Sequence, residues 1–199
     1  TGLDDVNAQL LVIAINNALQ SAAFNPAGAR LVRKGNNKAV VQLINDMKDG
    51  KVHALIMNGV NPVYTLPNGD QFAEALKKVK LSVSFSLKED ETAKITTVAA
   101  AAPHYLESWG DVSVAKGYYA VTQPTIRPLF NTKQFQDALL EWSGNASDFY
   151  AYLRANSASY VAGKTWNQLV HDGVAVSEVT GGATAAAINY ASAATLLAD

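Results

Sequence analysis

The sequence predicts an α/β fold, with a parallel Rossmann-like sheet, flanking helices, a β-hairpin near residues 112–122 and a mostly helical C-terminal part. Residues 52–57 form a nearly continuous apolar run, which is typical of a strand covered on both faces. A stretch with helical spacing separates it from residues 81–85, where apolar residues alternate with serines. Strands joined through a helix run parallel, so we expect loop 58–62 at the carboxyl edge of the sheet, where ligands usually bind.

The helices around these strands follow from apolar spacing. Residues 3–20 hold an unpunctuated apolar run, which predicts a buried helix. An amphipathic helix is expected over residues 40–47, and Gly50 is a signal for its C-terminal cap. Asp70 is a candidate N-cap for the helix between the two strands. A short helix over residues 89–95 and a small-residue strand over residues 96–102 should follow, and Pro103 should end that strand.

The predicted structure changes at about residue 110, from a parallel sheet to an antiparallel hairpin followed by helices. Lys116 and Gly117 form a two-residue loop that suits a tight hairpin between residues 112–115 and 118–122. Three helices are expected beyond it, marked by Phe135, Phe149 and Trp166 with their apolar neighbours. For the alanine-rich tail, residues 181–199, we predict a helix, with a loosely packed tail as the alternative. We expect an α/β domain over residues 1–142 and a helical extension packed on it over residues 143–199.

Composition excludes several classes of function. The chain of 199 residues contains no cysteine, which excludes disulfides, cysteine-ligated zinc and cysteine-bound iron–sulfur clusters from this sequence. Its 16 basic and 17 acidic residues are interspersed, so neither nucleic acid nor an anionic membrane is an expected partner. No apolar span reaches about 20 residues, and we expect no direct membrane insertion. The start at Thr1, without a signal-like region, suggests a piece of a longer chain.

Few polar side chains have the spacing that a metal site or a catalytic site requires. His53, His104 and His171 are far apart and lack ligand spacing, so we expect no metal site. We expect His104, beside Pro103, to face a cleft more than the other two histidines. The acidic residues Glu89, Asp90 and Glu91 could serve acid and base roles, but negative charge at the start of a helix explains them without any reaction. The motifs of hydrolases and of simple nucleotide-binding proteins are absent from the sequence.

Three segments resemble the molybdopterin oxidoreductase family in their order and spacing. They are the stretch from Gly50 to Pro62 (GKVHALIMNGVNP), Glu91-Thr92-Ala93, and Tyr105 to Asp111 (YLESWGD). With Gln123 to Leu129 (QPTIRPL) after Trp-Gly-Asp, the chain looks most similar to the iron–sulfur, molybdopterin-like subunit of bacterial alternative complex III, a quinol-oxidising electron-transfer complex. The resemblance covers residues 5–142 and is strongest from 50 to 130.

The resemblance implies contacts to a cofactor, if one is retained. The guanine dinucleotide arm of the pterin would lie near the strand-end loop, with Asn58, Gly59, Asn61 and Pro62 as candidate contacts and Glu91 and Thr92 as weaker ones. The sequence departs from the catalytic pattern after Gly110, where an Asn and a Gly-Arg pair usually help to grip the cofactor; residues 111–118 stand there instead. A dianionic pyrophosphate needs positive charge or a nest of backbone amides, so we expect the cofactor to be lost.

The resemblance therefore implies a cofactor-free structural scaffold, part of an oxidoreductase but not catalytic alone. Iron–sulfur clusters would lie elsewhere in the parent chain, and the partners would be other subunits of a membrane-associated redox complex on the periplasmic side of the bacterial inner membrane. One alternative is a genuine molybdopterin guanine dinucleotide-binding domain of a molybdenum oxidoreductase. Another is an α/β module that binds a small polar ligand through loop 58–62 and His104.

Overall fold

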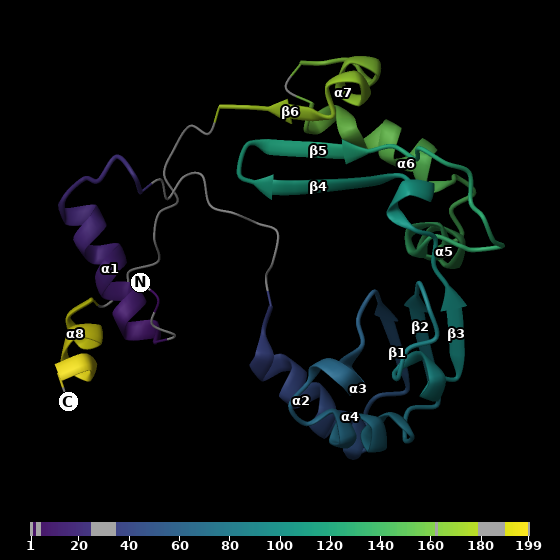
Figure 1. The fold of residues 1–199 in the computed structure, drawn as a ribbon, viewed down its shortest axis with the longest axis horizontal. Helices are drawn as coiled ribbons and strands as arrows, with labels where there is room; N and C mark the ends of the chain where they lie inside the picture. Colours follow the sequence, from purple (N-terminus) through teal and green to yellow (C-terminus); the bar gives the residue numbers. More distant parts are fainter. Residues whose placement is uncertain (1, 3–4, 25–34, 162, 179–189, 199) are drawn as a thin grey trace.

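The chain is described from a computed structural model over residues 2, 5–24, 35–161, 163–178 and 190–198. A parallel sheet contains β1 (Ala54–Asn58), β2 (Leu81–Ser86) and β3 (Val98–Ala101), in that order (Figure 1). Partners in a parallel ladder share a face, so Met57, Ser84 and Ala99 lie on one side of the sheet, and Ile56, Val83 and Val98 on the other. The predicted parallel α/β fold is confirmed.

Three helices accompany the first two strands. Helix α2 (Asn37–Lys48) precedes β1, and α3 (Pro62–Thr65) with α4 (Gly69–Leu76) connects β1 to β2. Helices α2 and α4 pack against the Met57 face of the sheet; the buried cluster is Ile44, Met47, Met57, Phe72, Ala75, Leu76 and Val79. Gly50 follows the C-cap residue Asp49 of α2 and has the left-handed φ of +71°, as its cap signal predicts.

On the other face of the sheet, α5 (Phe135–Trp142) packs against the middle strand, while Ile56 and Val98 remain exposed. Val83 and Phe85 pack against Ala138 of this helix. The ring of Phe85 lies edge-on to Phe135 at 5.1 Å and to Trp142 at 6.1 Å. Because aromatic pairs add to the free energy of area burial, these ring contacts stabilise the packing of α5 against β2.

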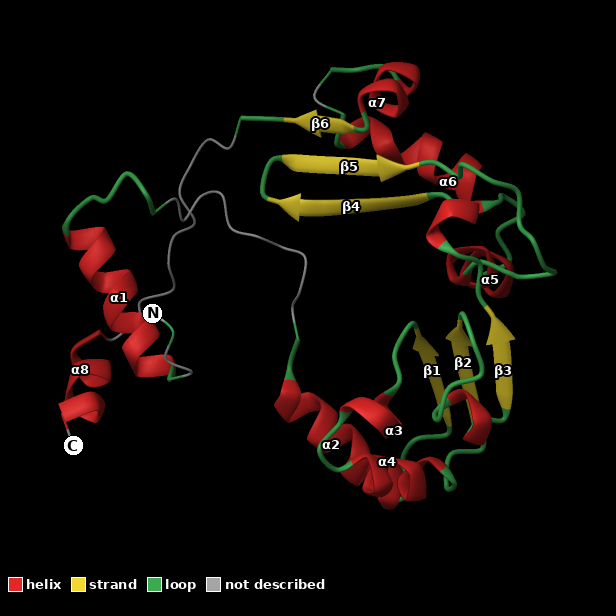
Figure 2. Cartoon of the chain, viewed as in Figure 1, coloured by secondary structure: helices red, strands yellow, loops and turns green. Residues whose placement is uncertain are grey.

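A second, antiparallel sheet contains β4 (Gly110–Ala115), β5 (Tyr118–Thr122) and β6 (Val174–Val176). The predicted hairpin is confirmed, and Gly117 adopts a φ of +80° in its turn. Helices α6 (Phe149–Asn156) and α7 (Trp166–Asp172) lie beside this sheet (Figure 2). Tyr119, Val161, Leu169 and Ala175 form one buried cluster there, and Leu140, Phe149 and Leu153 form another.

The two ends of the described chain form a pair of helices, α1 (Val6–Ala18) and α8 (Tyr190–Ala198), which contact each other. Helix α1 was predicted as buried, and that prediction is wrong, since Val6 and Ile15 are exposed and Ala8 is its buried residue. Its apolar side chains surround the helix, and α8 covers one side only. The tail is helical over residues 190–198; residues 181–189 lie outside the described part.

Several predicted boundaries shift. Helix α4 starts at Gly69 after Asn68, so Asp70 lies in its first turn and is not the N-cap. The short helix expected over residues 89–95 is a 3-10 turn, η1 (Ala93–Ile95), and a second one, η2 (Tyr105–Glu107), follows β3. A third, η3 (Ser157–Ser159), extends α6. In the described part of the chain, no helix combines the length and apolar character that crossing a bilayer requires. The division at residue 142 stays a prediction.

Gly69 provides a test of how tightly the β1–β2 connection is packed. A methyl group at this position would lie 2.0 Å from the carbonyl oxygen of Val63, which belongs to the backbone of α3. We expect Gly69→Ala to lower the free energy of unfolding by about 1–3 kcal/mol, because the backbone must move to admit the methyl group. Urea unfolding measures this loss. Gly35→Ala is the matched control, since Gly35 has open space around it; equal stability of the two variants would contradict the close approach.

Candidate functional site at the carboxyl edge of the parallel sheet

The loop after β1 leaves the sheet through a glycine. Asn58 ends β1, and the N–H of Gly59 donates to the carbonyl of Phe85 at 2.9 Å, which extends the contact with β2 by one residue. Gly59 has a φ of +63°, in the left-handed region where a side chain would be strained. Asn58 and Gly59 therefore lie at the carboxyl edge, as predicted, and the backbone of Gly59 turns the chain towards α3.

The side chain of Asn61 joins the two loops of this edge. Its Oδ1 accepts from the hydroxyl of Thr92 at 2.7 Å and from the N–H of Thr92 at 3.2 Å, and its Nδ2 donates to Glu91 at 2.7 Å. The hydroxyl of the fully buried Thr92 accepts in turn from the N–H of Val63 at 3.1 Å. Pro62 occupies the first helical position of α3. The structure thus brings Asn61, Glu91 and Thr92 together, here called the Asn61 network.

The acidic residues Asp90 and Glu91 of the β2–β3 connection also accept hydrogen bonds within the chain. Asp90 accepts from the N–H of Ala93 at 2.9 Å and from the hydroxyl of Ser86 at 3.0 Å. The amide of Asn61 and a backbone hydrogen bond lower the pKa of Glu91 below its ordinary value of 4.5. Asp90 and Glu91 therefore hold the turn in place, which favours the structural interpretation of these acids over acid and base catalysis.

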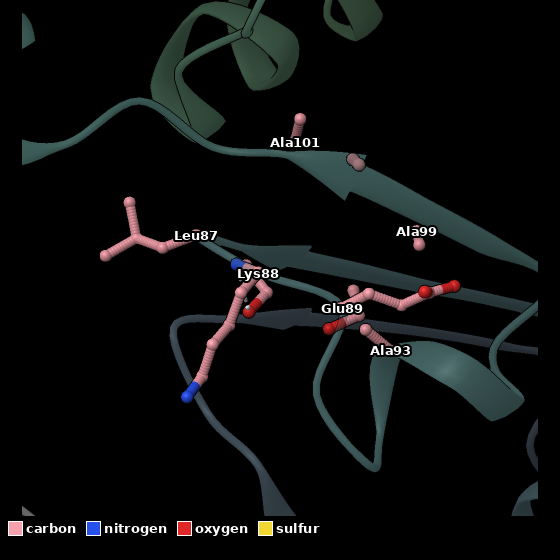
Figure 3. A pocket seen from close by; sticks show the side chains of 9 residues that line it. Leu87, Lys88, Glu89, Ala93, Ala99 and Ala101 are labelled. Carbon is pink, nitrogen blue, oxygen red and sulfur yellow. Dashed lines mark hydrogen bonds between the residues drawn. The ribbon is translucent and has the colours of Figure 1, made fainter.

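A small hollow of about 170 Å³ lies at this edge between β2, β3 and their connection (Figure 3). The residues that line it are Ser84, Ser86, Leu87, Lys88, Glu89, Ala93, Ala99, Ala100 and Ala101. They include none of the six predicted contact residues. Pockets for drug-sized ligands usually measure about 300–1,000 Å³, so this hollow suits a smaller group.

Ser84 is the polar group at the bottom of this hollow. It is almost fully buried, and its hydroxyl has no hydrogen-bond partner in the described part of the chain. The other polar side chains of the lining are Ser86, Lys88 and Glu89, and the opposite charges of Lys88 and Glu89 offset each other. Sequence reasoning did not select Ser84, although the alternation of serines along residues 82–86 was the signal that could have revealed a polar face on β2.

The histidines take local structural roles. The ring Nδ1 of His104 accepts from the N–H of Leu106 at 3.3 Å, and Glu107 accepts from the N–H of His104, which makes a capping box for η2. His104 thus caps a turn and does not line the hollow. His53 is exposed just before β1, not inside the strand, and His171 is exposed beside Asp172. Within the described ranges, no three histidine or carboxylate side chains gather as a metal site would require.

The segment after Gly110, which departs from the resembling family, forms the hairpin of β4 and β5. The hydroxyl of Tyr119 donates to the carboxylate of Asp111 at 3.0 Å. Burial, and then this hydrogen bond to an anion, raises the pKa of Tyr119 above its ordinary value of 10.0. The hairpin therefore presents a carboxylate in the segment directly after Gly110.

The Asn61 network can be tested through its buried hydroxyl. Thr92→Val keeps the shape of the side chain but removes the donor to Asn61 and the acceptor for Val63. We expect a loss of about 1–3 kcal/mol in the free energy of unfolding, since buried polar groups lose their partners. Chemical denaturation measures it. The control Thr122→Val, on an exposed residue of β5, should change stability by less than about 0.5 kcal/mol; similar losses in both variants would argue against the network.

The lowered pKa of Glu91 provides a second test. Because the pKa is lower in the folded chain, the carboxylate stabilises the fold above pH 4.5, and this contribution is lost as the pH falls through the folded pKa. A carbon-13 NMR titration of the Glu91 carboxyl should give a pKa below 4.5 in the native chain. In Asn61→Ala the value should rise towards 4.5. An unchanged titration in that variant would assign the shift to another cause.

Known proteins share sequence or fold with this chain. No protein-family model matches the chain. The chain is 31% identical over 140 residues to the menaquinone reductase, molybdopterin-binding-like subunit, of Nitratidesulfovibrio vulgaris; the match covers 65% of this chain and 20% of that protein. Acetylene hydratase from Pelobacter acetylenicus shares the fold, with a TM-score of 0.59 and 16% identity over 70% of this chain and 21% of the hydratase.

The chain spans about a fifth of the length of each of these proteins. The sequence similarity supports the resemblance to molybdopterin oxidoreductases that the motifs indicate, and the structural similarity shows a shared fold.

Proposed function

We propose that this chain is a cofactor-free scaffold region of an oxidoreductase subunit in a quinone-linked redox complex. Its role is to provide a rigid α/β body and contacts to other subunits, while electron transfer occurs on groups held elsewhere. The similarity to a subunit of menaquinone reductase supports the redox complex as its setting. The resemblance to alternative complex III, and with it the periplasmic side of the inner membrane, belongs to the same proposal.

The Asn61 network is the observation that carries the proposal. Both polar atoms of the Asn61 amide are hydrogen-bonded to residues of the chain itself, Glu91 and Thr92. An amide that meets a nucleotide must offer a donor or an acceptor to it. At this edge, binding a nucleotide through Asn61 would break bonds that hold the two loops together.

The charge of the edge also disfavours a bound nucleotide. Glu89, Asp90 and Glu91 follow one another beside the hollow, and Lys88 is the cation in its lining. A pyrophosphate carries negative charge, so three adjacent carboxylates oppose its approach. The charge of these residues and the internal hydrogen bonds of Asn61 therefore do not fit a pterin guanine dinucleotide.

The content of molybdenum and pterin in the native parent subunit tests the proposal. The subunit is purified within its complex, molybdenum is measured by mass spectrometry, and pterin by the fluorescence of its oxidised form. We expect both to be far below one per subunit, because the Asn61 amide is already hydrogen-bonded within the chain and the adjacent carboxylates Glu89, Asp90 and Glu91 repel an anion. Stoichiometric molybdenum and pterin would overturn the scaffold proposal in favour of a cofactor-binding domain. A molybdenum enzyme of the same family, taken through the same purification, controls for loss of cofactor.

A further inference from the structure

A separate pocket of about 310 Å³ lies on the antiparallel sheet, away from the carboxyl edge of β1 to β3. It opens between the hairpin of β4 and β5 and the segment formed by α6 and η3. Its floor is apolar and buried, and consists of Tyr119, Phe149 and Leu153. Asp111, Tyr152 and Tyr160 lie at its rim and are exposed.

Aromatic rings dominate the lining of this pocket. The rings of Tyr119 and Tyr160 stack on each other, with centroids 4.9 Å apart and planes inclined by 22°. Phe149 and Tyr152 come from the same helix, α6, and line the same space. The faces of aromatic rings carry negative potential and attract cations. The pocket therefore offers both apolar area and an electrostatic preference for positive charge.

The polar groups of the pocket include two acceptors, the Asp111 carboxylate and the side-chain oxygen of Asn156. One oxygen of the Asp111 carboxylate accepts from Tyr119, and the other has no hydrogen-bond or ion-pair partner among the described residues. The amide of Asn156 donates to the carbonyl of Tyr152 at 2.8 Å, so its own oxygen stays free to accept. The lining contains no lysine, arginine or histidine. A donor with positive charge would satisfy these groups.

We propose that this pocket binds a guanidinium or alkylammonium group, provided by an arginine or lysine side chain of a partner protein or by a free amine. Such a group places its charge against the aromatic rings and donates to Asp111. An anion would be repelled by the carboxylate. A purely apolar group would cover Asp111 and leave its oxygen without a partner, which costs free energy. The proposal is independent of whether the carboxyl edge of the parallel sheet holds a cofactor.

The first test compares ethylguanidinium with ethylurea, its neutral counterpart of similar shape. Each is titrated into the whole chain labelled with nitrogen-15, and amide shifts are followed by NMR. Saturable shifts at Asp111, Tyr119 and the α6 to η3 segment are expected with ethylguanidinium and not with ethylurea. Equal responses to the two compounds, or no response to either, would overturn the proposal.

Two variants locate the binding. Asp111→Asn keeps an acceptor for Tyr119 but removes the charge, and should weaken ethylguanidinium binding by about tenfold. Tyr160→Leu, which changes an exposed ring, should weaken it severalfold and serves if Asp111→Asn fails to fold. The matched control Asp49→Asn removes a carboxylate after α2, outside this pocket, and should leave binding unchanged. Unchanged affinity in a folded pocket variant would assign the binding elsewhere and refute the site.

The source of the cation is distinguished by a capped Gly-Arg-Gly peptide. Affinity clearly above that of ethylguanidinium would indicate an arginine on a protein partner, because the peptide backbone then adds contacts around the pocket. Equal affinity would indicate a free small cation as the occupant. No binding of either probe contradicts the proposal.

Discussion

The position of β2 between two parallel partners is the constraint on which the rest of the structure depends. Its ladder to β1 and β3 buries both faces of the strand, and the two faces differ: Val83 and Phe85 are apolar, whereas Ser82 and Ser84 are polar. Helix α5 packs against the apolar face, and the N–H of Lys133, just before it, donates to the carbonyl of Ala101 in β3. The serine face requires polar neighbours, and Ser82 finds one in Thr97, whose N–H donates to its hydroxyl at 2.9 Å. Strand β2 thereby fixes both the second half of the chain and the loops of the carboxyl edge.

Several polar side chains of the carboxyl edge are hydrogen-bonded to neighbouring loops of the chain itself, and this has a functional consequence. At ligand-binding edges of α/β sheets, loop amides and side chains converge on a ligand and leave part of their hydrogen-bonding capacity for it. Here Asn61, Asp90 and Thr92 direct that capacity to neighbouring loops. Such cross-links resist the small displacements by which loops close on a nucleotide. Loops that are cross-linked in this way keep their positions relative to the sheet. A scaffold within a multi-subunit complex needs such fixed surfaces for its contacts.

The sequence was sufficient for features that depend on neighbours in the chain. The alternation in β2 and the glycine at 117 predict the strand and the hairpin, and parallel order places Asn61, Glu91 and Thr92 at one edge. It was insufficient where partners come from far away. The bonds within the Asn61 network join residues about thirty positions apart. A three-residue strand such as β6 is too short to show an alternation of apolar and polar residues. The burial of α1 depends on what packs against it.

Asp111 bears on both the proposed absence of a cofactor and the proposed cation-binding pocket. It stands in the segment where the resembling family grips an anionic cofactor with cationic and small residues, and here its carboxylate is hydrogen-bonded to the buried Tyr119. A carboxylate at this position disfavours phosphate by direct repulsion, so its presence opposes a cofactor role. The same carboxylate, beside stacked tyrosines and without a cation of its own in the described chain, favours a positively charged guest. The Asp111 carboxylate thus bears on both proposals, since it repels a nearby anion and can pair with a basic group.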